Sequence, residues 1–419
     1  MTPLKTSGPA PSAINQHTPR LLLRVCLPFA FGYFLSYLYR AINAVIAPDL
    51  VTAFALDADD LGLLTGAYFL TFALAQIPLG IALDRFGPRR TEAVLLVFAA
   101  GGAATFALAG DLEGLILGRA LIGLGVSACL MAAFKAFALW FPKERLPLIN
   151  GVQMAAGGLG ALMATTPVQA ALSITDWRGV FFCISVLTVL SAAAILIIVP
   201  GDRDRCVQAS VRELWGGVVR IYTSTLFWRY APVTVLSQAS FLAIQSLWTG
   251  PWLAEVEAMP RSDVAVTLLA IATAMTAGFL VLGWTAERLG RKGIRPMHVA
   301  FVGMAAFMAS QVVIICGWGS GLTLPWLAFG FFGTTGILPY AALSQSFPLH
   351  LAGRVNTALN VLVFITAFLA QWAIGGVIDA WPGVDPKQGY RAAFSMMLAL
   401  QGFAALWFMT FRRDGVPAD

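Results

Sequence analysis

Long runs of apolar residues, separated by short polar segments, recur along the whole chain. Runs of about 18 to 25 mostly apolar residues are long enough to cross a hydrocarbon layer roughly 30 Å thick as helices. The pattern therefore predicts an all-α membrane protein with twelve transmembrane helices. The predicted spans are 22–47, 59–82, 92–109, 114–139, 148–172, 178–199, 226–252, 264–283, 296–316, 323–345, 355–378 and 391–411.

One polar interruption divides these spans into two sets of six. It runs from Pro200 to about Thr225 and contains four arginines and three acidic residues. We therefore expect an N-terminal six-helix bundle in residues 1–199, a cytoplasmic linker with one surface helix in residues 200–225, and a C-terminal six-helix bundle in residues 226–419.

The two halves carry matching landmarks in the same order, which indicates an internal duplication. The matched pairs are Asp84-Arg85-x-Gly87 with Glu287-Arg288-x-Gly290, Phe141-Pro142…Asn150 with Phe347-Pro348…Asn356, and Trp177-Arg178-x-x-Phe181 with Tyr390-Arg391-x-x-Phe394. A duplicated bundle predicts pseudo-symmetric halves with a cavity at their interface, as in carriers that work by alternating access.

Composition and charge agree with a membrane location. The chain is 58% hydrophobic and 11% charged, whereas soluble domains carry roughly 25% charged residues. With both termini in the cytoplasm, about 20 of the 27 basic residues fall on the cytoplasmic side, as the positive-inside rule requires. The net charge of +6 is thus a topology signal, and we expect no nucleic-acid partner. The first apolar run is too long for a secretory signal, so it should remain as the first helix.

Short motifs between the predicted second and third spans and in and directly after the fourth span resemble those of the major facilitator superfamily, and the resemblance covers essentially the whole chain. They are Gly80-x-x-x-Asp84-Arg85-x-Gly87-x-Arg89-Arg90, Arg119-x-x-x-Gly123-x-Gly125, and the segment Trp140-Phe-Pro-Lys-Glu-Arg145. The resemblance implies a secondary transporter in which such basic loops hold the two halves together in one state. It therefore assigns gating to Gly80, Asp84, Arg85, Gly87 and Arg89 and, in the repeat, to Gly283, Glu287, Arg288 and Gly290.

The residues of the first basic loop are consistent with that role. Gly80 would permit close helix approach, Asp84 could accept hydrogen bonds from a helix N-terminus, and Gly87 would supply a turn that a side chain obstructs. The alternative is that the arginines only fix the topology.

Three basic residues lie within predicted spans, whereas all 21 acidic residues fall in loops or at span ends. An ionisable group at membrane depth is a functional candidate by default, so this imbalance favours an anionic substrate. Arg40 shares a helical face with Ser36, Tyr37 and Asn43. It resembles the Arg of an Asp-Arg pair in first helices of organic-anion members of the superfamily, although Tyr39 replaces the Asp. Structural pairing or snorkelling is the alternative for Arg40.

Arg119 matches a family arginine linked to proton coupling or substrate binding, and a structural role is equally open. Lys135 could snorkel to the headgroups.

In span 226–252, one helical face carries Gln238, Phe241, Gln245, Trp248 and Trp252. We expect this face to look into the cavity. The alternative for the tryptophans is anchoring at the membrane interface. Helix–helix hydrogen bonding is the alternative for Asn356 and Asn360. The predicted substrate-binding residues are Tyr37, Arg40, Asn43, Arg119, Gln238, Gln245, Trp248, Asn356 and Asn360.

The sequence shows no catalytic constellation, nucleotide-binding loop or metal-ligand spacing, so we predict no enzyme, cofactor or metal. Our first hypothesis is a transporter of a small organic or inorganic anion, in the inner membrane and as a monomer, with membrane lipid around it. The alternatives are efflux of amphipathic drug-like compounds and, more remotely, a membrane sensor that does not transport.

Overall fold

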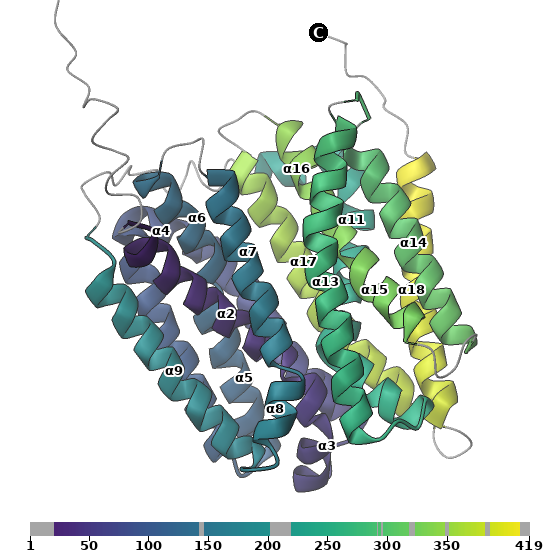
Figure 1. Cartoon of the computed structure of the whole chain (residues 1–419). Helices are drawn as coiled ribbons and strands as arrows, with labels where there is room; N and C mark the ends of the chain where they lie inside the picture. Colours follow the sequence, from purple (N-terminus) through teal and green to yellow (C-terminus); the bar gives the residue numbers. More distant parts are fainter. Residues whose placement is uncertain are drawn as a thin grey trace, which may run out of the picture.

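The computed structural model describes residues 21–141, 146–201, 219–290, 292–294, 296–317, 323–347, 352–381 and 386–410. Helices dominate these ranges, and no strand occurs in them. Helices of the first half gather on one side of the molecule and those of the second half on the other (Figure 1). The predicted all-α membrane fold is confirmed. Eight helical segments are long and apolar enough to span a bilayer by length and composition, so the number twelve stays a prediction.

The first half follows the predicted spans, but several spans contain a break. Its elements are η1 (Leu22–Cys26), α2 (Leu27–Ala41), α3 (Asn43–Phe54), α4 (Ala58–Leu108), α5 (Leu112–Val126), α6 (Cys129–Trp140), α7 (Leu146–Met163), α8 (Thr166–Ala171) and α9 (Trp177–Ile198). The long α4 consists of two helices joined at Gly87, whose φ of 76° is not helical. Span 114–139 is divided between α5 and α6.

The second half has more irregular turns. Its elements are α11 (Thr225–Ala243), η3 (Ile244–Trp248), α12 (Thr249–Pro251), η4 (Trp252–Val256), α13 (Arg261–Gly290), α14 (Pro296–Cys316), α15 (Leu324–Gly333), η5 (Thr334–Ile337), α16 (Leu338–Gln345), α17 (Ala352–Asp379) and α18 (Pro386–Thr410). Here η3 and η4 are π-helical turns, and η5 is a 3₁₀ turn. Residues 202–218 of the predicted linker lie outside the described ranges.

Aspartates begin three helices of the first half at the same end of the bundle. The side chains of Asp57, Asp111 and Asp176 accept hydrogen bonds from backbone N–H groups three residues later, at 2.7 to 2.8 Å. Such N-caps satisfy donors that the helix itself leaves unpaired. The helix starts are thus fixed by local sequence.

The duplicated Trp/Tyr-Arg landmark has the same packing role in both halves. Arg178 of α9 donates to the carbonyls of Ala107 and Ala109, at 2.6 and 2.8 Å, where α4 ends. Arg391 of α18 places Nη2 beside Gly317, where α14 ends, 3.3 Å from where a Cβ would lie. Each arginine therefore lies beside the end of an earlier helix of its half, and Arg178 binds that end by hydrogen bonds.

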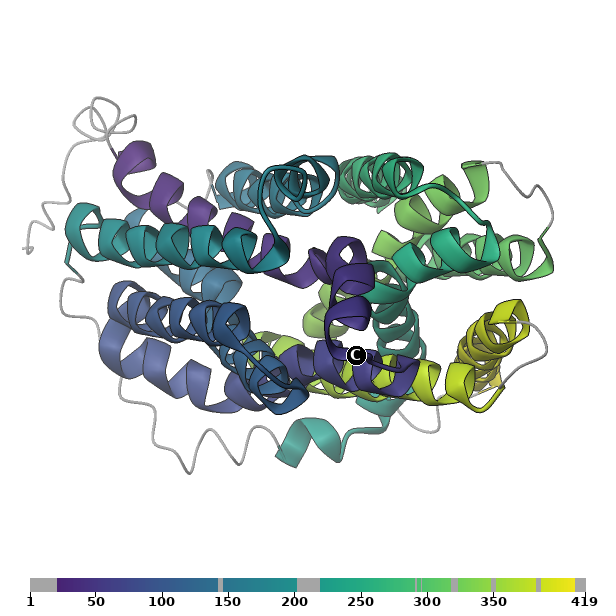
Figure 2. The ribbon, with the colours of Figure 1, turned by 90° about the horizontal axis from the view of Figure 1, so that it is seen from below.

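At one end of the interface between the halves, the two backbones approach each other closely. A Cβ on Gly62 would lie 2.6 Å from the carbonyl oxygen of Gln371. Gly250 abuts the carbonyl of Ala44 in the same way, and Gly375 abuts that of Ala58. Seen from this side, α3 reaches across to the second half (Figure 2). We call this region the closed end.

Polar contacts strengthen the rim of the closed end. Arg261 of α13 forms a two-pronged ion pair with Asp49 of α3 and donates to Gln169 at 3.0 Å. Asp379, at the end of α17, accepts from the backbone N–H groups of Ala58 and Asp59 at 3.2 and 2.6 Å. A carboxylate at a helix N-terminus is favoured by the exposed N–H groups and the helix dipole.

The opposite end, which carries the two basic loops, is the open end. No heavy atom outside the local backbone lies within 4 Å of a Cβ position on Gly80, Gly283 or Gly290. The close approach predicted at Gly80 is therefore absent in this conformation, where Gly80 is exposed. Among the described residues, the close backbone contacts between the halves lie at the closed end.

Candidate functional site

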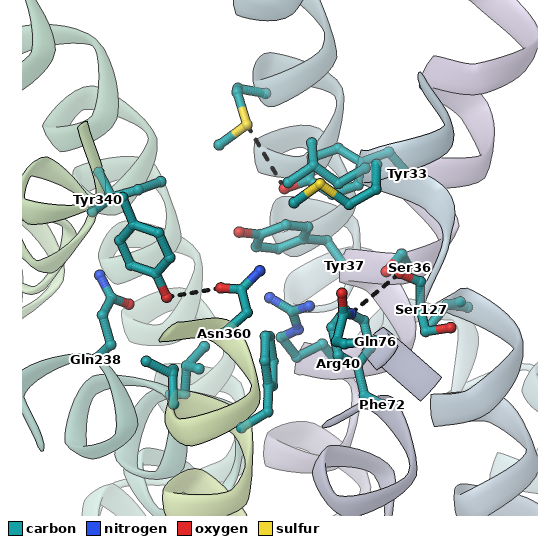
Figure 3. A pocket seen from close by; sticks show the side chains of 18 of the residues that line it. Tyr33, Ser36, Tyr37, Arg40, Phe72, Gln76, Ser127, Gln238, Tyr340 and Asn360 are labelled. Carbon is teal, nitrogen blue, oxygen red and sulfur yellow. Dashed lines mark hydrogen bonds between the residues drawn. The ribbon is translucent and has the colours of Figure 1, made fainter. Parts of the chain in front are cut away.

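A cavity of about 250 Å³ lies between the two halves. Its wall is formed by α2, α4, α6 and α7 on one side, and by α11, α13, α16 and α17 on the other (Figure 3). Drug-sized ligands occupy pockets of roughly 300 to 1,000 Å³. The cavity therefore suits a small solute.

Arg40 is the only charged side chain among the described residues that line this cavity. It is 7% exposed, and its guanidinium carbon lies 4.6 Å from the centroid of the Tyr37 ring and 5.5 to 5.6 Å from those of Phe364 and Phe72. Aromatic faces stabilise a cation without neutralising it. The buried Nε atom has no hydrogen-bond partner in the described structure, so protein groups do not satisfy all the donors of this guanidinium.

The rest of the wall combines amides and hydroxyls with apolar surface. The second half contributes Gln238, Gln245, Asn356 and Asn360, and Tyr340 donates to Oδ1 of Asn360 at 2.8 Å. That bond orients the Asn360 amide so that its nitrogen remains a donor. The cavity wall therefore presents one cationic group and several neutral polar groups to a bound solute.

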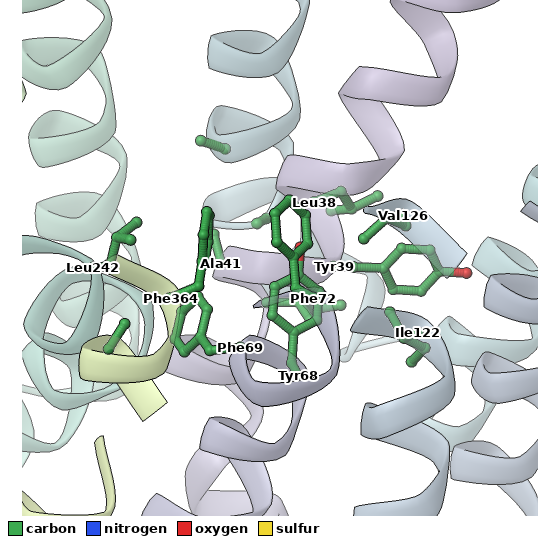
Figure 4. Close-up of a cluster of buried hydrophobic side chains, with 14 of the residues drawn as sticks. Leu38, Tyr39, Ala41, Tyr68, Phe69, Phe72, Ile122, Val126, Leu242 and Phe364 are labelled. Carbon is green, nitrogen blue, oxygen red and sulfur yellow. The ribbon is translucent and has the colours of Figure 1, made fainter. Parts of the chain in front are cut away.

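An aromatic layer separates the cavity from the closed end. Phe72 of α4 and Phe364 of α17 meet across the interface with ring centroids 4.2 Å apart, and Phe69 lies 6.0 Å from Phe364 (Figure 4). Both Phe72 and Phe364 also line the cavity. Movement of the solute past this layer requires the two halves to separate there.

Six of the predicted binding residues lie on the cavity wall: Tyr37, Arg40, Gln238, Gln245, Asn356 and Asn360. Arg119 is not among the lining residues. Its side chain is 1% exposed and donates to the carbonyl of Tyr39 at 2.9 Å, with the Tyr68 ring 5.2 Å away. Arg119 therefore supports α2 on the side away from the cavity. Its hydrogen bond goes to the Tyr39 carbonyl, close to the end of α2.

Asn43 and Trp248 are the other two predictions that do not reach the cavity. The chain turns at Ile42, and Asn43 donates to Thr65 at 2.8 Å within the first half. The π-helical turn 244–248 rotates the residues after Gln245 relative to a regular α-helix. Trp248 therefore points into the second half and donates to Gln371 at 3.3 Å, and Trp252 stacks on Phe394 at 4.6 Å.

Glu92 lies at the end of a predicted span, as expected, but its side chain is buried. Glu92 is fully buried in α4, about one helical turn after Gly87. Lys135 does not snorkel to the surface as expected but donates to the carbonyl of Leu83 at 2.8 Å. The sequence placed both groups at a helix end, and neighbouring helices cover that end in the structure.

Residues 29–371 match the family model described as Major Facilitator Superfamily. The chain belongs to the major facilitator superfamily. A hexuronate transporter of Escherichia coli strain K12 is 28% identical over 174 residues, but the match spans only 42% of this chain and 40% of that protein. A probable sulfoacetate transporter of Cupriavidus necator is 23% identical over 395 residues, which cover 89% of this chain and 90% of that protein.

Solved structures agree on the fold of this superfamily member. A bacterial homologue of the human lysosomal transporter Spinster, in an inward-facing and occupied conformation, superposes with a TM-score of 0.72. It is 17% identical and covers 93% of this chain and 97% of its own. At that identity the likeness shows the fold alone.

The first basic loop has the turn that the family motif predicts. Gly87 adopts φ 76° and ψ 163°, a region that is essentially restricted to glycine, and Arg89 donates to the carbonyl of Leu196 at the end of α9. Arg85 lies over the Phe86 ring at 5.5 Å. The side chain of Asp84 lies outside the described residues.

The second basic loop differs from the first in one respect. Gly290, the counterpart of Gly87, ends α13, and the left-handed residue is Gly293, with φ 85°. Glu287 is exposed in this loop, and Arg288 lies over the Trp284 ring at 5.0 Å. The expected correspondence between Gly87 and Gly290 therefore fails in backbone geometry, because α13 stays helical through Gly290 and the left-handed glycine comes three positions later, at Gly293.

The polar lining residues that sequence reasoning missed include Gln76 and Ser127. Gln76 donates to the backbone carbonyl of Ser127 at 3.5 Å, at the break between α5 and α6. A glutamine in the middle of an apolar span was a usable signal, since a buried amide needs partners. The break at Ser127 has no comparable signal in the sequence.

Proposed function

We propose that this protein is a secondary transporter that moves a small organic or inorganic anion by alternating access. The observation that carries the proposal is Arg40, a buried guanidinium on the wall of an interface cavity whose described lining contains no acidic side chain. A buried cation without a carboxylate is stabilised by an anionic ligand. Hydrogen bonds from a guanidinium to carboxylate-type oxygens are also short and strong.

The names of the relatives support an anionic cargo. Hexuronate and sulfoacetate are both small anions, and sulfoacetate is the named cargo of a relative matched over most of both chains. Efflux of amphipathic compounds is less well supported, because the cavity is small and the single lining charge would repel cationic drugs. The amides of Gln238, Gln245, Asn356 and Asn360, with Tyr37, would contact the polar remainder of the solute.

In the proposed cycle the anion enters from the open end and binds Arg40. Neutralising the guanidinium removes the cost of bringing it into a closed, water-poor cavity. The open end then closes through the two basic loops, in which Gly80, Asp84, Arg85, Gly87 and Arg89 act with Gly283, Glu287, Arg288 and Gly290. The closed end separates in turn and releases the anion on the other side.

The remaining expectations are part of the same proposal. The protein would be a monomer in the inner membrane, with both termini and the open end facing the cytoplasm, as the distribution of basic residues indicates. The two moving bodies would be residues 1–199 and 226–419, joined by the linker 200–225. Catalysis has no place in this cycle, since the solute is moved unchanged.

Thermal unfolding of the purified protein tests the substrate class. The panel contains galacturonate, sulfoacetate, nitrate, uncharged galactose and a cationic amphiphile. A ligand at about 100 times its Kd stabilises the folded protein by about 2.7 kcal/mol. We expect stabilisation by at least one anion and by neither galactose nor the amphiphile.

Arg40→Gln should weaken binding of that anion about ten- to a hundredfold, because it removes a charge-assisted hydrogen bond of about 1.5 to 3 kcal/mol. The matched control is Arg229→Gln, since Arg229 lies near the Phe408 ring at 5.5 Å and away from the cavity. Stabilisation by the amphiphile alone, or equal anion binding by Arg40→Gln, would refute the proposal.

A further inference from the structure

Glu92 is a fully buried carboxyl in the membrane-spanning part of α4, away from the cavity. Neither of its side-chain oxygens has a hydrogen-bond partner of good geometry in the described structure, and the one group that interacts with the carboxyl is the thiol of Cys129, a weak donor. Buried carboxyl groups normally have such partners, because the unmet hydrogen bonds of an ionised oxygen are costly to bury. The position of Glu92 therefore needs an explanation.

The neighbours of Glu92 leave space for the carboxyl but supply no counter-charge. On α2, Gly32 faces it, and a Cβ there would lie 2.5 Å from Oε1, with Leu96 of α4 alongside. On α6, the thiol of Cys129 is the one titratable group with which Glu92 interacts in the described structure. Arg40 acts through space on that thiol. No lysine, arginine or histidine of the described residues pairs with Glu92.

A carboxyl in such a place is far cheaper to bury as the neutral acid than as the anion. A charged side chain at membrane depth costs several kcal/mol unless water, a partner or a ligand compensates it. None of the contacts around Glu92 does so. In this conformation the group is therefore built to hold a proton.

The same helices that enclose Glu92 form the cavity wall. Tyr33 follows Gly32 on α2 and lines the cavity, and Leu130 follows Cys129 on α6 and does the same. A change of α2 or α6 that accompanies anion binding would thus alter the packing around Glu92. The carboxyl is one helix layer from Arg40 and separate from it.

We propose that Glu92 is the proton-binding site of this transporter and that one proton travels with each anion. A proton passes from water to a carboxylate oxygen of Glu92 before the cavity closes. It returns to water in the opposite conformation, when a shift of α2 or α6 within the first half opens a path to the carboxyl. The cargo, an anion with one proton, then crosses without net charge. This inference rests on the proposed transport function.

Infrared spectroscopy tests the protonated carboxyl without any substrate. At neutral pH, the wild-type spectrum should contain the carbonyl stretch of a neutral carboxylic acid, and Glu92→Gln should lose it. Glu113→Gln is the matched control, because Glu113 is an exposed glutamate at the start of α5, and it should keep the band. Absence of the band in wild type, or its persistence in Glu92→Gln, would overturn the proposal.

Transport of radiolabelled galacturonate in proteoliposomes tests the coupling. One proton per anion lets a pH difference of one unit support about tenfold accumulation. Glu92→Gln, which is permanently neutral, should lose this accumulation and retain galacturonate exchange at equal pH on both sides. Accumulation equal to wild type in Glu92→Gln would show that the role of Glu92 is merely structural.

The two measurements separate this inference from the function on which it rests. If wild type exchanges no galacturonate, the transport of that anion fails, and the infrared band still decides whether Glu92 holds a proton. Should Glu92→Gln not fold, Cys129→Ala serves as the second variant, since it removes the group that interacts with the carboxyl. The neutral-acid band must then shift in frequency, and an unshifted band would count against the assignment.

Discussion

Glycines occur at both ends of the interface, but they serve different purposes there. At the closed end, Gly62 and its equivalents lie against the carbonyls of the opposite half, so that any side chain would push the halves apart. At the open end, Gly80, Gly283 and Gly290 touch nothing within 4 Å. Glycine therefore permits backbone contact between the halves at the closed end. At the open end the glycines make no such contact in this conformation.

The two ends also differ in their polar contacts. The closed end joins the halves through Arg261 with Asp49 and through Asp379 with the start of α4. At the open end, the described contact of Arg89 is with Leu196, within its own half. A loop that is tied to its own bundle can move with that bundle as a body, as alternating access requires.

The largest effect is expected from Gly62→Leu. The atoms in its way belong to the backbone of α17, with the Gln371 oxygen 2.6 Å from the new Cβ, so they cannot rotate aside. Overpacking costs about 1 to 3 kcal/mol, which corresponds to roughly a five- to 150-fold loss of the closed conformation at this end. Labelling of a cysteine placed at Ser246, which is buried at the closed end, should increase accordingly.

The matched control is Gly80→Leu at the open end. Since Gly80 touches nothing, this variant should leave labelling at Ser246 low, or lower it further by blocking closure of the open end. Equal labelling of the two variants would remove the distinction between the ends.

A second, smaller effect concerns the turns of the two basic loops. Gly87→Ala should destabilise the protein by about 1 to 3 kcal/mol, because a Cβ is strained at the observed φ and ψ. Gly290→Ala should cost nothing or stabilise slightly, since that residue is helical. Thermal unfolding in detergent compares the two, and similar losses would contradict the different backbone geometry.

The smallest effect belongs to the rim of the closed end. The ion pair between Arg261 and Asp49 is partly exposed, with 42% and 28% of the side-chain surfaces accessible. Exposed pairs contribute only about 0.2 to 1 kcal/mol. Arg261→Gln should therefore raise labelling at Ser246 about fivefold at most, and high salt should mimic it. The charge swap Asp49→Arg with Arg261→Asp should return labelling toward the wild-type level. If it does not, this ion pair does not contribute to closure of the closed end.

Periodic and compositional signals predicted the fold well. The apolar runs predict the helical segments, and the glycine of the first basic loop predicts the turn observed at Gly87. Arg40 was found because a charge in an apolar run is conspicuous. The predicted polar face places Gln238 of α11 and Gln245 of η3 on the cavity wall, two helical turns apart.

The failures share a cause, which is irregular helix geometry and contact between distant segments. A π-helical turn moved Trp248 out of the cavity, and a hydrogen bond to Thr65 of α4 holds Asn43 within the first half. Glu92 lay at the start of a predicted span, where a carboxylate can usually reach water. Its burial depends on Gly32 and Cys129, which are distant in sequence, and no spacing within one helix reveals that contact.

Electron–electron distance measurements between spin labels test the central claim, that the two ends alternate, most directly. One pair spans the closed end at Val51 and Val266, and the other spans the open end at Phe86 and Ile294, all of them exposed positions. In Gly62→Leu, relative to wild type, the closed-end distance should lengthen while the open-end distance shortens. If both distances stay unchanged or move in the same direction, the two ends are not coupled and the account of alternating access is wrong.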